Sequence, residues 1–261
     1  MRLIDLSMPL DDVIPVDPPF LRPKIEYKDH QAGLADMHAM YGIEPEQLRD
    51  GQGLAAETVT ITTHAGTHVD APWHYHPTMN GGEKAWTIDE VPLDWFFRPG
   101  VKLDLRHLPN GHLVTPADID AELARIGHEL RPFDIVLAHT VASAAYGDED
   151  YIDTGIGFGR DATLHLTGRG VRVVGTDAWG WDLPVSINRR LFEETGDPSI
   201  VWEGHKAGAD VAYCQIEKLQ NLEALPATGF TVACFPTKVR GASAGWTRAV
   251  AILDDDEPDA E

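Results

Sequence analysis

Cysteine is scarce in this sequence. The 261 residues include two, Cys214 and Cys234, and no Cys-x-x-Cys pair occurs. A zinc site built from thiolates is therefore excluded. Both cysteines lie in apolar segments, which predicts two buried free thiols in a reducing compartment.

Long apolar runs are also missing. No stretch approaches the roughly 18 consecutive apolar residues of a membrane helix. The first ten residues, MRLIDLSMPL, lack the apolar core of a secretory signal peptide. We therefore expect a cytoplasmic protein without a membrane partner.

Basic residues are few. Lys and Arg together number 21 against 42 Asp and Glu, for a formal net charge of −21. The last eight residues, 254–261, contain six acids and no base, which leaves −15 on the rest of the chain. Nucleic acids and anionic membranes need a basic surface, so neither is expected as a partner. Residues 254–261 are predicted to be an acidic C-terminal tail in solvent.

Three common motifs of enzymes are absent. The sequence contains no Gly-x-Ser-x-Gly elbow, no P-loop and no Gly-x-Gly-x-x-Gly after a predicted strand. A serine nucleophile on such an elbow and a nucleotide-phosphate loop are therefore not expected. The expected partner is a small-molecule substrate whose binding does not depend on these motifs.

The length of the chain suits one large domain, and no repeat or linker divides it. We expect a single domain over 1–253. Alternating or β-branched apolar residues predict strands at 2–10, 57–64, 101–106, 134–140, 171–176, 211–219, 230–239 and 247–253. Helices are predicted at 29–50 (one or two short ones, broken at Gly42), 115–127, 161–169 and 187–195. Strands alternate with helices, so the fold class is α/β.

One stretch concentrates the side chains that carry chemistry. Residues 64–76, HAGTHVDAPWHYH, contain four of the twelve histidines and an aspartate. His64, His68 and Asp70 form an HxxxHxD pattern. Imidazole and carboxylate together suit a divalent ion such as Zn²⁺, Mn²⁺ or Fe²⁺. The pattern therefore predicts a metal site.

The backbone around these ligands is predicted to bend. Neighbouring β-branched residues and Gly66 disfavour a helix, and Ala65 occupies the place where a zincin helix needs glutamate. On a straight strand the Cα atoms of His64 and His68 would lie about 13 Å apart, at roughly 3.3 Å per residue. We predict that Gly66 turns the chain and brings the two histidines together.

His74 is the candidate proton carrier. It lies six residues beyond His68, after Pro72, which ends the predicted strand. A hydrolytic metal site needs a group near neutral pKa to take and return a proton. His74 is therefore predicted to be the catalytic acid/base, and His76 is expected beside the site or at the surface.

The segment HAGTHVDAPWH resembles the HxGTHxDxPxH signature of the cyclase family of metal-dependent hydrolases, and every fixed position matches. This family includes bacterial kynurenine formamidase and isatin hydrolase. The resemblance implies that His64, His68 and Asp70 bind the metal and that His74 is the catalytic acid/base.

The same resemblance implies a second part of the site and a fold. A later histidine and an acid twelve residues further on complete a second metal position in formamidases, and His205 and Glu217 have this spacing. Either one or two ions, Mn²⁺ or Zn²⁺, are implied. The implied fold is a swivelling β/β/α type, a mixed, barrel-like central sheet flanked by helices, assembled as a homodimer or homotetramer.

The sequence also departs from the formamidase pattern. Formamidases carry a Trp-Pro-Gly-Asp segment in the N-terminal loop, where this chain has Ile14-Pro15-Val16-Asp17. The additional segments 177–182 and 242–246 resemble the isatin-hydrolase-like branch. The expected substrate is therefore an aryl or cyclic amide rather than formylkynurenine.

Four tryptophans and a serine are candidates for the substrate pocket, because ligand sites favour aromatic side chains. They lie in the signature or beside glycine-rich turns: Trp73, Trp179, Trp181, Ser243 and Trp246. Ser243 or Arg240 is the candidate for holding a product carboxylate. The other three tryptophans, Trp86, Trp95 and Trp202, are expected in the core or at an interface.

The expected function is that of a metal-dependent amidohydrolase acting on C–N bonds other than peptide bonds. The alternatives are an arylformamidase, a lactone hydrolase or cyclase that uses the same ion, and a non-catalytic metal-binding protein. The last alternative would need His64, His68 and Asp70 but not His74.

Overall fold

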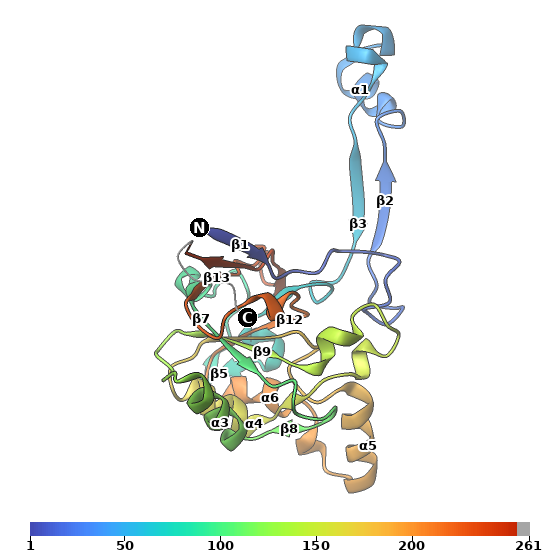
Figure 1. Cartoon of the computed structure of the whole chain (residues 1–261). Coiled ribbons are helices and arrows are strands. Elements are labelled where there is room, and N and C mark those ends of the chain that lie inside the picture. The colour runs from blue at the N-terminus through green and yellow to red at the C-terminus, as the bar shows by residue number, and fades with distance from the viewer. Residues whose placement is uncertain (255–261) are drawn as a thin grey trace.

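The computed structural model describes residues 1–254, and a mixed β-sheet forms its centre (Figure 1). Within these residues, nine strands form the sheet in the order β1-β15-β13-β7-β9-β11-β12-β4-β14. Their bounds are β1 Arg2–Asp5, β4 His68–Asp70, β7 Phe97–Asp104, β9 Ile135–His139, β11 Val173–Thr176, β12 Cys214–Glu217, β13 Phe230–Ala233, β14 Ala244–Trp246 and β15 Val250–Leu253. The sheet curls into a half-barrel, as the resemblance implied.

The middle of the sheet is parallel and the flanks are antiparallel. Strands β7, β9, β11 and β12 run in one direction, while β4 and β14 add antiparallel strands on one side. Every residue of β9, β11 and β12 is buried. Such continuous burial is typical of parallel strands covered on both faces. The carboxyl ends of the four parallel strands meet at one edge, where functional residues of open α/β sheets gather.

The helices of the described residues are α1 Leu34–Tyr41, α2 Pro72–Tyr75, α3 Pro116–Ile126, α4 Arg160–Thr167, α5 Val185–Thr195 and α6 Glu203–Lys206. Helices α1, α3, α4 and α5 end close to where the sequence predicted, whereas the short helices α2 and α6 were not predicted. The hydroxyl of Thr115 accepts a hydrogen bond from the Asp118 N–H to cap α3, and Gly127 ends this helix at φ 66°. Short 3-10 helices lie at Pro45–Gln47, Arg49–Gly51, Leu93–Trp95, Val141–Ala145, Tyr151–Asp153, Pro198–Ile200, Ala207–Ala209 and Leu222–Ala224.

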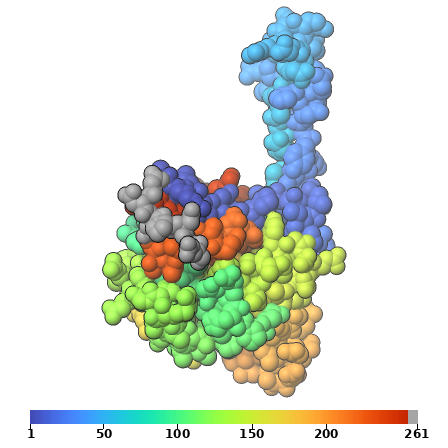
Figure 2. Space-filling model, in the orientation of Figure 1, coloured from blue at the N-terminus to red at the C-terminus, as the bar shows by residue number. Residues whose placement is uncertain are grey.

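Three two-stranded ribbons lie outside the main sheet. They pair β2 Lys24–Lys28 with β3 Ala56–Thr60, β5 Thr78–Met79 with β6 Glu83–Lys84, and β8 Leu113–Val114 with β10 Gly157–Phe158. The β2–β3 ribbon and α1 at its tip project away from the body as an arm (Figures 1 and 2). No residue of α1 is buried.

The predicted elements agree with the structure in kind and differ at some ends. The strand predicted at 57–64 ends at Thr60, because the chain turns before His64. The strand predicted at 230–239 ends at Ala233, shortly before Pro236, which cannot continue a ladder. Strand β14 was not predicted, since its segment is rich in Gly, Ala and Ser.

Other expectations have mixed outcomes. Cys214 and Cys234 are both free and fully buried, as predicted. No helix among residues 1–254 is long and apolar enough to cross a membrane. Of the predicted acidic tail, Asp254 is exposed, and 255–261 lie outside the described residues.

Candidate metal centre

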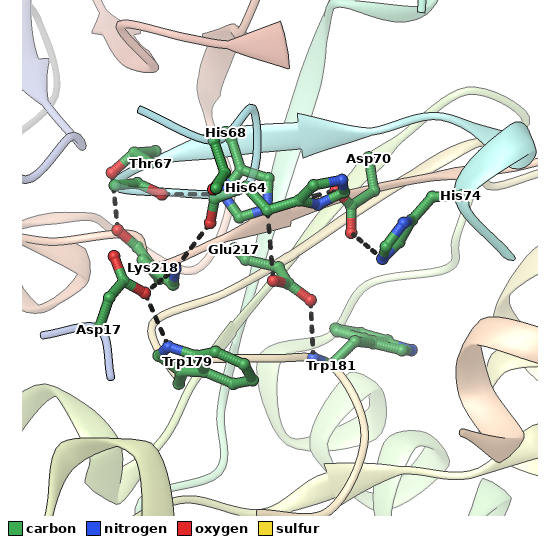
Figure 3. A network of polar contacts seen from close by, with 12 residues as sticks. Asp17, His64, Thr67, His68, Asp70, His74, Trp179, Trp181, Glu217 and Lys218 are labelled. Atoms are coloured by element: carbon green, nitrogen blue, oxygen red, sulfur yellow. Dashed lines mark hydrogen bonds and ion pairs between the residues drawn. The ribbon is translucent and has the colours of Figure 1, made fainter. Parts of the chain in front are cut away.

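Strand β4 carries the centre of the site. It is three residues long and lies between β12 and β14. His68 and Asp70 lie on the same face of β4 because their side chains are two positions apart. On the neighbouring strand, Glu217 is directly opposite His68. The sheet register therefore places three potential ligands on one surface (Figure 3).

The turn before β4 adds His64. Gly66 has φ 62°, in the left-handed region that favours glycine, which confirms the predicted bend. The imidazole rings of His64 and His68 lie 5.2 Å apart, centroid to centroid. His64 Nδ1 lies 2.8 Å from Asp70 Oδ1. The turn thus brings together the two histidines that a straight strand would separate.

Hydrogen bonds on the outer sides of the rings fix both histidines. His68 Nδ1 lies 2.8 Å from the carbonyl oxygen of Gly66, and His64 Nε2 lies 2.9 Å from Ser243 Oγ. If these nitrogens carry the protons, His68 Nε2 and His64 Nδ1 keep free lone pairs. Those two nitrogens are the ones that face Asp70.

The inward-facing atoms have no hydrogen-bond partner. His68 Nε2 lies 3.2 Å from Asp70 Oδ1 and 3.5 Å from Glu217 Oε2. Nevertheless, His68 Nε2 and both carboxylate oxygens of Asp70 are buried and make no bond of hydrogen-bond geometry in the described structure. Buried polar groups left in this way are costly, whereas convergence on one point is the geometry of ligands around a cation. The donor set fits a divalent metal ion.

His205 extends the ligand set from α6. Its Nε2 lies 3.7 Å from Glu217 Oε1 and 3.9 Å from Asp70 Oδ2. Its Nδ1 forms a short contact with Asp182 Oδ2. The Asp182 carboxylate also accepts the N–H groups of Gly204 and His205, which holds the first turn of α6 in place. Burial alone would lower the pKa of His205, but Asp182 raises it to about 9.

His74 closes the other side of the site. Its Nε2 lies 3.9 Å from Asp70 Oδ2, and its ring centroid lies 4.0 Å from that of His64. Burial lowers the pKa of His74 to about 4. Two sets of atoms are close enough to share a cation, His64/Asp70/His74 and His68/Asp70/Glu217, and Asp70 belongs to both.

The pKa values of the two central carboxylates, Asp70 and Glu217, shift in opposite directions. Burial alone would raise the pKa of Asp70, but the facing imidazoles hold it well below its usual range. Burial and the charge of Asp70 raise the pKa of Glu217. Asp70 is therefore the carboxylate that is anionic before any cation binds.

A buried lysine connects the site to the N-terminal loop (Figure 3). Lys218 Nζ lies 2.6 Å from Asp17 Oδ1 and 2.8 Å from the carbonyl oxygen of His64. The indole Nε1 of Trp179 donates to the same Asp17 oxygen, at 2.9 Å. This contact network holds the turn that carries His64 against the loop that replaces the formamidase segment.

A cavity of about 610 Å³ opens over these residues. His64, His74, His205 and Glu217 line its floor. Its walls are mostly apolar and include Leu21, Ile152, Ile156, Trp179, Val185, Phe192, Val201 and Trp202. The size and lining are typical of a small-molecule site.

Of the predicted pocket residues, only Trp179 lines this cavity. Trp73 points outward and is 41% exposed, because its short helix turns the side chain to the surface. Trp181 is fully buried and stacks on Phe158, although its backbone N–H contacts Glu217 Oε1. The expectation that these two tryptophans line the pocket is corrected.

The other two predicted pocket residues support the ligands instead. Ser243 Oγ lies 2.9 Å from His64 Nε2, and Ser243 does not line the cavity. Trp246 lies on the edge strand β14, and its Nε1 donates to the carbonyl oxygen of Thr62. Arg240 does not line the cavity either. His76 is exposed and contacts Thr78.

Two residues that contact His205 were not predicted to lie at the site. Trp202, expected in the core or at an interface, is 43% exposed and stacks on His205 with ring centroids 4.7 Å apart. Asp182 orients His205. Its spacing from His205, 23 residues, matches no local pattern, so the sequence offered no signal for it.

Comparisons with known proteins place this chain in a family. The Cyclase family model, described as "Putative cyclase", matches residues 4–183. Kynurenine formamidase of Salinibacter ruber (strain DSM 13855 / M31) is 29% identical over 193 residues, which cover 74% of this chain and 77% of that protein.

Solved structures share the fold. An isatin hydrolase bound to the product analogue thioisatinate superposes with a TM-score of 0.75 at 20% identity, covering 97% of this chain and 93% of that one. Isatin hydrolase A from Ralstonia solanacearum gives a TM-score of 0.75 at 21% identity, covering 97% and 92%. Because the family model matches well over half of the sequence and includes the ligand-bearing turn, the chain belongs to the Cyclase family.

Proposed function

We propose that this chain is a metal-dependent amidohydrolase that cleaves the C–N bond of an aryl or cyclic amide. The observation that carries the proposal is the convergence of unpartnered, buried atoms of His68 and Asp70 beside His64, His205 and Glu217, three residues that line an apolar pocket. Membership of the Cyclase family supports a hydrolytic reaction, and the isatin hydrolase structures share the fold.

Five residues would hold the ion. In this proposal His64, His68 and Asp70 are the primary ligands, with Asp70 shared by both groups of close atoms, and His205 and Glu217 would complete a second position. Imidazole with carboxylate suits Mn²⁺ or Zn²⁺. When bound, such a cation lowers the pKa of water and polarises a carbonyl group.

His74 is the proton carrier. Because burial lowers its pKa to about 4, its imidazole is neutral at pH 7 and can accept a proton from the attacking water. Its Nε2 faces Asp70, whose negative charge stabilises the imidazolium that results. The proton then passes from His74 to the departing nitrogen.

The pocket walls orient the substrate and exclude water. Trp179 and Trp202 line the cavity, and Trp202 lies over His74 and His205, with its ring centroid 5.3 Å from that of His74. Flat aromatic faces suit an aryl group. The apolar walls also strengthen the electrostatic interactions at the floor.

Replacing His74 by Ala tests the mechanism. The His74→Ala variant is expected to retain its metal and lose at least about 100-fold in turnover, the usual contribution of a general acid/base. The matched control is His76→Ala, because His76 is exposed and its side chain forms hydrogen bonds with Thr78 alone among residues 1–254. Full activity of His74→Ala would contradict the assignment, and loss of metal from it would make His74 a ligand instead.

The identity of the substrate is tested with matched compounds. The relative in Salinibacter ruber favours an arylformamidase as the second candidate function. Metal-loaded protein should be assayed with isatin, formylkynurenine, acyl anilides and lactones of the same shape. We expect the cyclic and aryl amides to be cleaved fastest. A bound ion with no cleavage of any compound would favour a metal-binding protein.

We also propose a homodimer or homotetramer, with the β2–β3 arm at the contact between copies. A lone two-stranded ribbon is at best marginally stable in water, and Tyr27 and Tyr41 on the arm are 72% and 70% exposed. Light scattering should give a mass of at least two chains, reduced by Tyr27→Glu. A monomeric wild-type protein would contradict the proposal.

A further inference from the structure

One face of helix α5 forms a wall of the pocket. Val185, Asn188, Arg189 and Phe192 all line the cavity, and their spacing of i, i+3, i+4 and i+7 places them on one side of a helix. The two apolar residues are each 40% exposed. Between them lie an amide and a guanidinium group, so the face is polar at its middle.

Asn188 is buried without an apparent structural role. It is 7% exposed and is the one buried residue of α5, yet its Oδ1 has no hydrogen-bond partner in the described part of the chain. A buried amide that lacks a partner calls for an explanation. The oxygen and nitrogen of an asparagine can exchange places by a flip, so the group can accept from a ligand or donate to it.

Arg189 lines the pocket on its exposed side and has no ion pair with another of the described residues. Lys218, the other basic side chain of the lining besides the histidines, is committed to Asp17 and the His64 carbonyl. The neighbouring residue, Arg190, forms an ion pair in which its Nε lies 3.8 Å from Glu194 Oε1. Arg189 has no ion pair with any residue between 1 and 254, although the chain has twice as many acids as bases.

We propose that Asn188 and Arg189 recognise a carboxylate carried by the substrate, away from the bond that is cleaved. The guanidinium fork binds the carboxylate, and the Asn188 amide forms a hydrogen bond with the same group or with a polar atom beside it. This inference rests on the proposed function, and it narrows the substrate class to aryl or cyclic amides with an acidic substituent.

The test measures binding, which needs no turnover. The probes are 4-phenylbutanoate and 4-phenylbutanamide, which have the same shape and differ in the charge of the head group. Quenching of tryptophan fluorescence reports occupancy, because Trp179 and Trp202 line the pocket. The wild-type protein, as purified, is expected to bind the carboxylate about tenfold or more tightly than the amide.

Variants of two adjacent arginines show whether the carboxylate preference depends on Arg189 itself or on any positive charge near the pocket. Arg189→Gln is expected to abolish the preference for the carboxylate, Arg189→Lys to restore part of it, and Arg190→Gln to leave it unchanged. Asn188→Leu should weaken both probes while the unfolding midpoint stays within a few degrees. Equal binding of the two probes, binding of neither, or an unchanged preference in Arg189→Gln would overturn the proposal.

A failure of the proposed hydrolysis would look different. If no amide is cleaved but Arg189→Gln loses the carboxylate preference, the recognition site stands and the reaction is wrong. If amides are cleaved, Arg189→Gln should raise KM for acidic substrates by a larger factor than KM for the neutral substrates of the same shape.

Discussion

Two buried aspartates at the ends of nearby strands differ in their surroundings. Asp70 and Asp177 both have no exposed surface. Asp177 accepts the N–H of Thr140, at 2.9 Å, and the Thr140 hydroxyl, at 2.7 Å. Asp70 has no hydrogen bond to either oxygen and faces four imidazoles instead. The comparison separates a carboxylate that supports the scaffold from one that is built to bind a cation.

The two aspartates also differ in charge. The imidazoles hold the pKa of Asp70 well below its usual range, against the effect of burial. Burial raises the pKa of Asp177 to about 7, despite the hydrogen bonds from Thr140. Burial alone therefore does not identify a ligand. The nature of the facing groups does.

The largest expected effect comes from exchanging the two carboxylates for amides. Asp70→Asn is expected to lose the bound ion and at least about 1,000-fold in activity, because a shared anionic ligand is removed. Asp177→Asn should retain both, since an amide oxygen can still accept from Thr140. Elemental analysis and initial rates measure the two outcomes. Equal metal content in the two variants would contradict the claim that Asp70, and not Asp177, binds the ion.

A smaller effect is expected at Asp182, which acts through His205. Asp182→Asn should weaken metal affinity about 10- to 100-fold, because the imidazole loses the carboxylate that orients it. The control is Asp210→Asn, whose carboxylate is half exposed and pairs with Arg160 at 3.0 Å. Calorimetric titration with Mn²⁺ measures the affinities. An unchanged affinity in Asp182→Asn would remove His205 from the ligand set.

The turn at Gly66 can be tested against a glycine of the same conformation. Gly66→Ala and Gly42→Ala place a side chain at φ 62° and 64°, a backbone conformation that costs about 1 kcal/mol at either position, and the added methyl at Gly66 must also displace the side chain of Leu10. Only Gly66 holds His64 beside Asp70, so only Gly66→Ala should also reduce metal affinity. Thermal unfolding and metal titration give the two readouts. Equal metal affinity in both variants would show that the bend does not position His64.

The last comparison concerns the dependence of stability on pH. Asp177 has a folded pKa of about 7 against about 4 when unfolded, so the stability from its neutral form is present below pH 4 and lost as pH rises to 7. Burial lowers the pKa of the adjacent His139 to about 4, so its contribution rises over nearly the same range. In the wild-type protein, Asp177 makes the free energy of unfolding fall as pH rises, and His139 makes it rise, so the two changes oppose each other.

Asp177→Asn removes the pH-dependent contribution of Asp177 to the free energy of unfolding. The variant should gain stability relative to wild type between pH 4 and 7, up to a plateau of no more than about 4 kcal/mol. Urea unfolding of both proteins at each pH gives the difference, in which all other groups cancel. A difference that does not change with pH would mean that Asp177 is ionised throughout.

The ligand-bearing turn could be predicted from the sequence because it is local. His64, Gly66, His68 and Asp70 lie within seven residues, so their spacing alone indicated a common ion and a bend. The helix and strand types were equally readable from apolar patterns and caps, as at α3. Ends of strands were less accurate where a turn or a proline interrupted the pattern.

The distal groups could not be derived from local patterns. His205 and Glu217 were found through the family resemblance, because only the folded sheet and α6 bring them to β4. Trp202 and Asp182 were missed, since their roles depend on how α6 packs. Of the tryptophans expected in the pocket, Trp179 lines it, whereas Trp73 does not, because an aromatic residue near a ligand in sequence can still face away.

Metal content tests the central claim most directly. Elemental analysis of the purified wild-type chain, with Asp70→Asn and Asp177→Asn alongside, should find one or two Mn²⁺ or Zn²⁺ ions per chain in the wild type and in Asp177→Asn, and none in Asp70→Asn. A wild-type chain that holds no divalent ion, even after incubation with Mn²⁺ and Zn²⁺, would contradict the account.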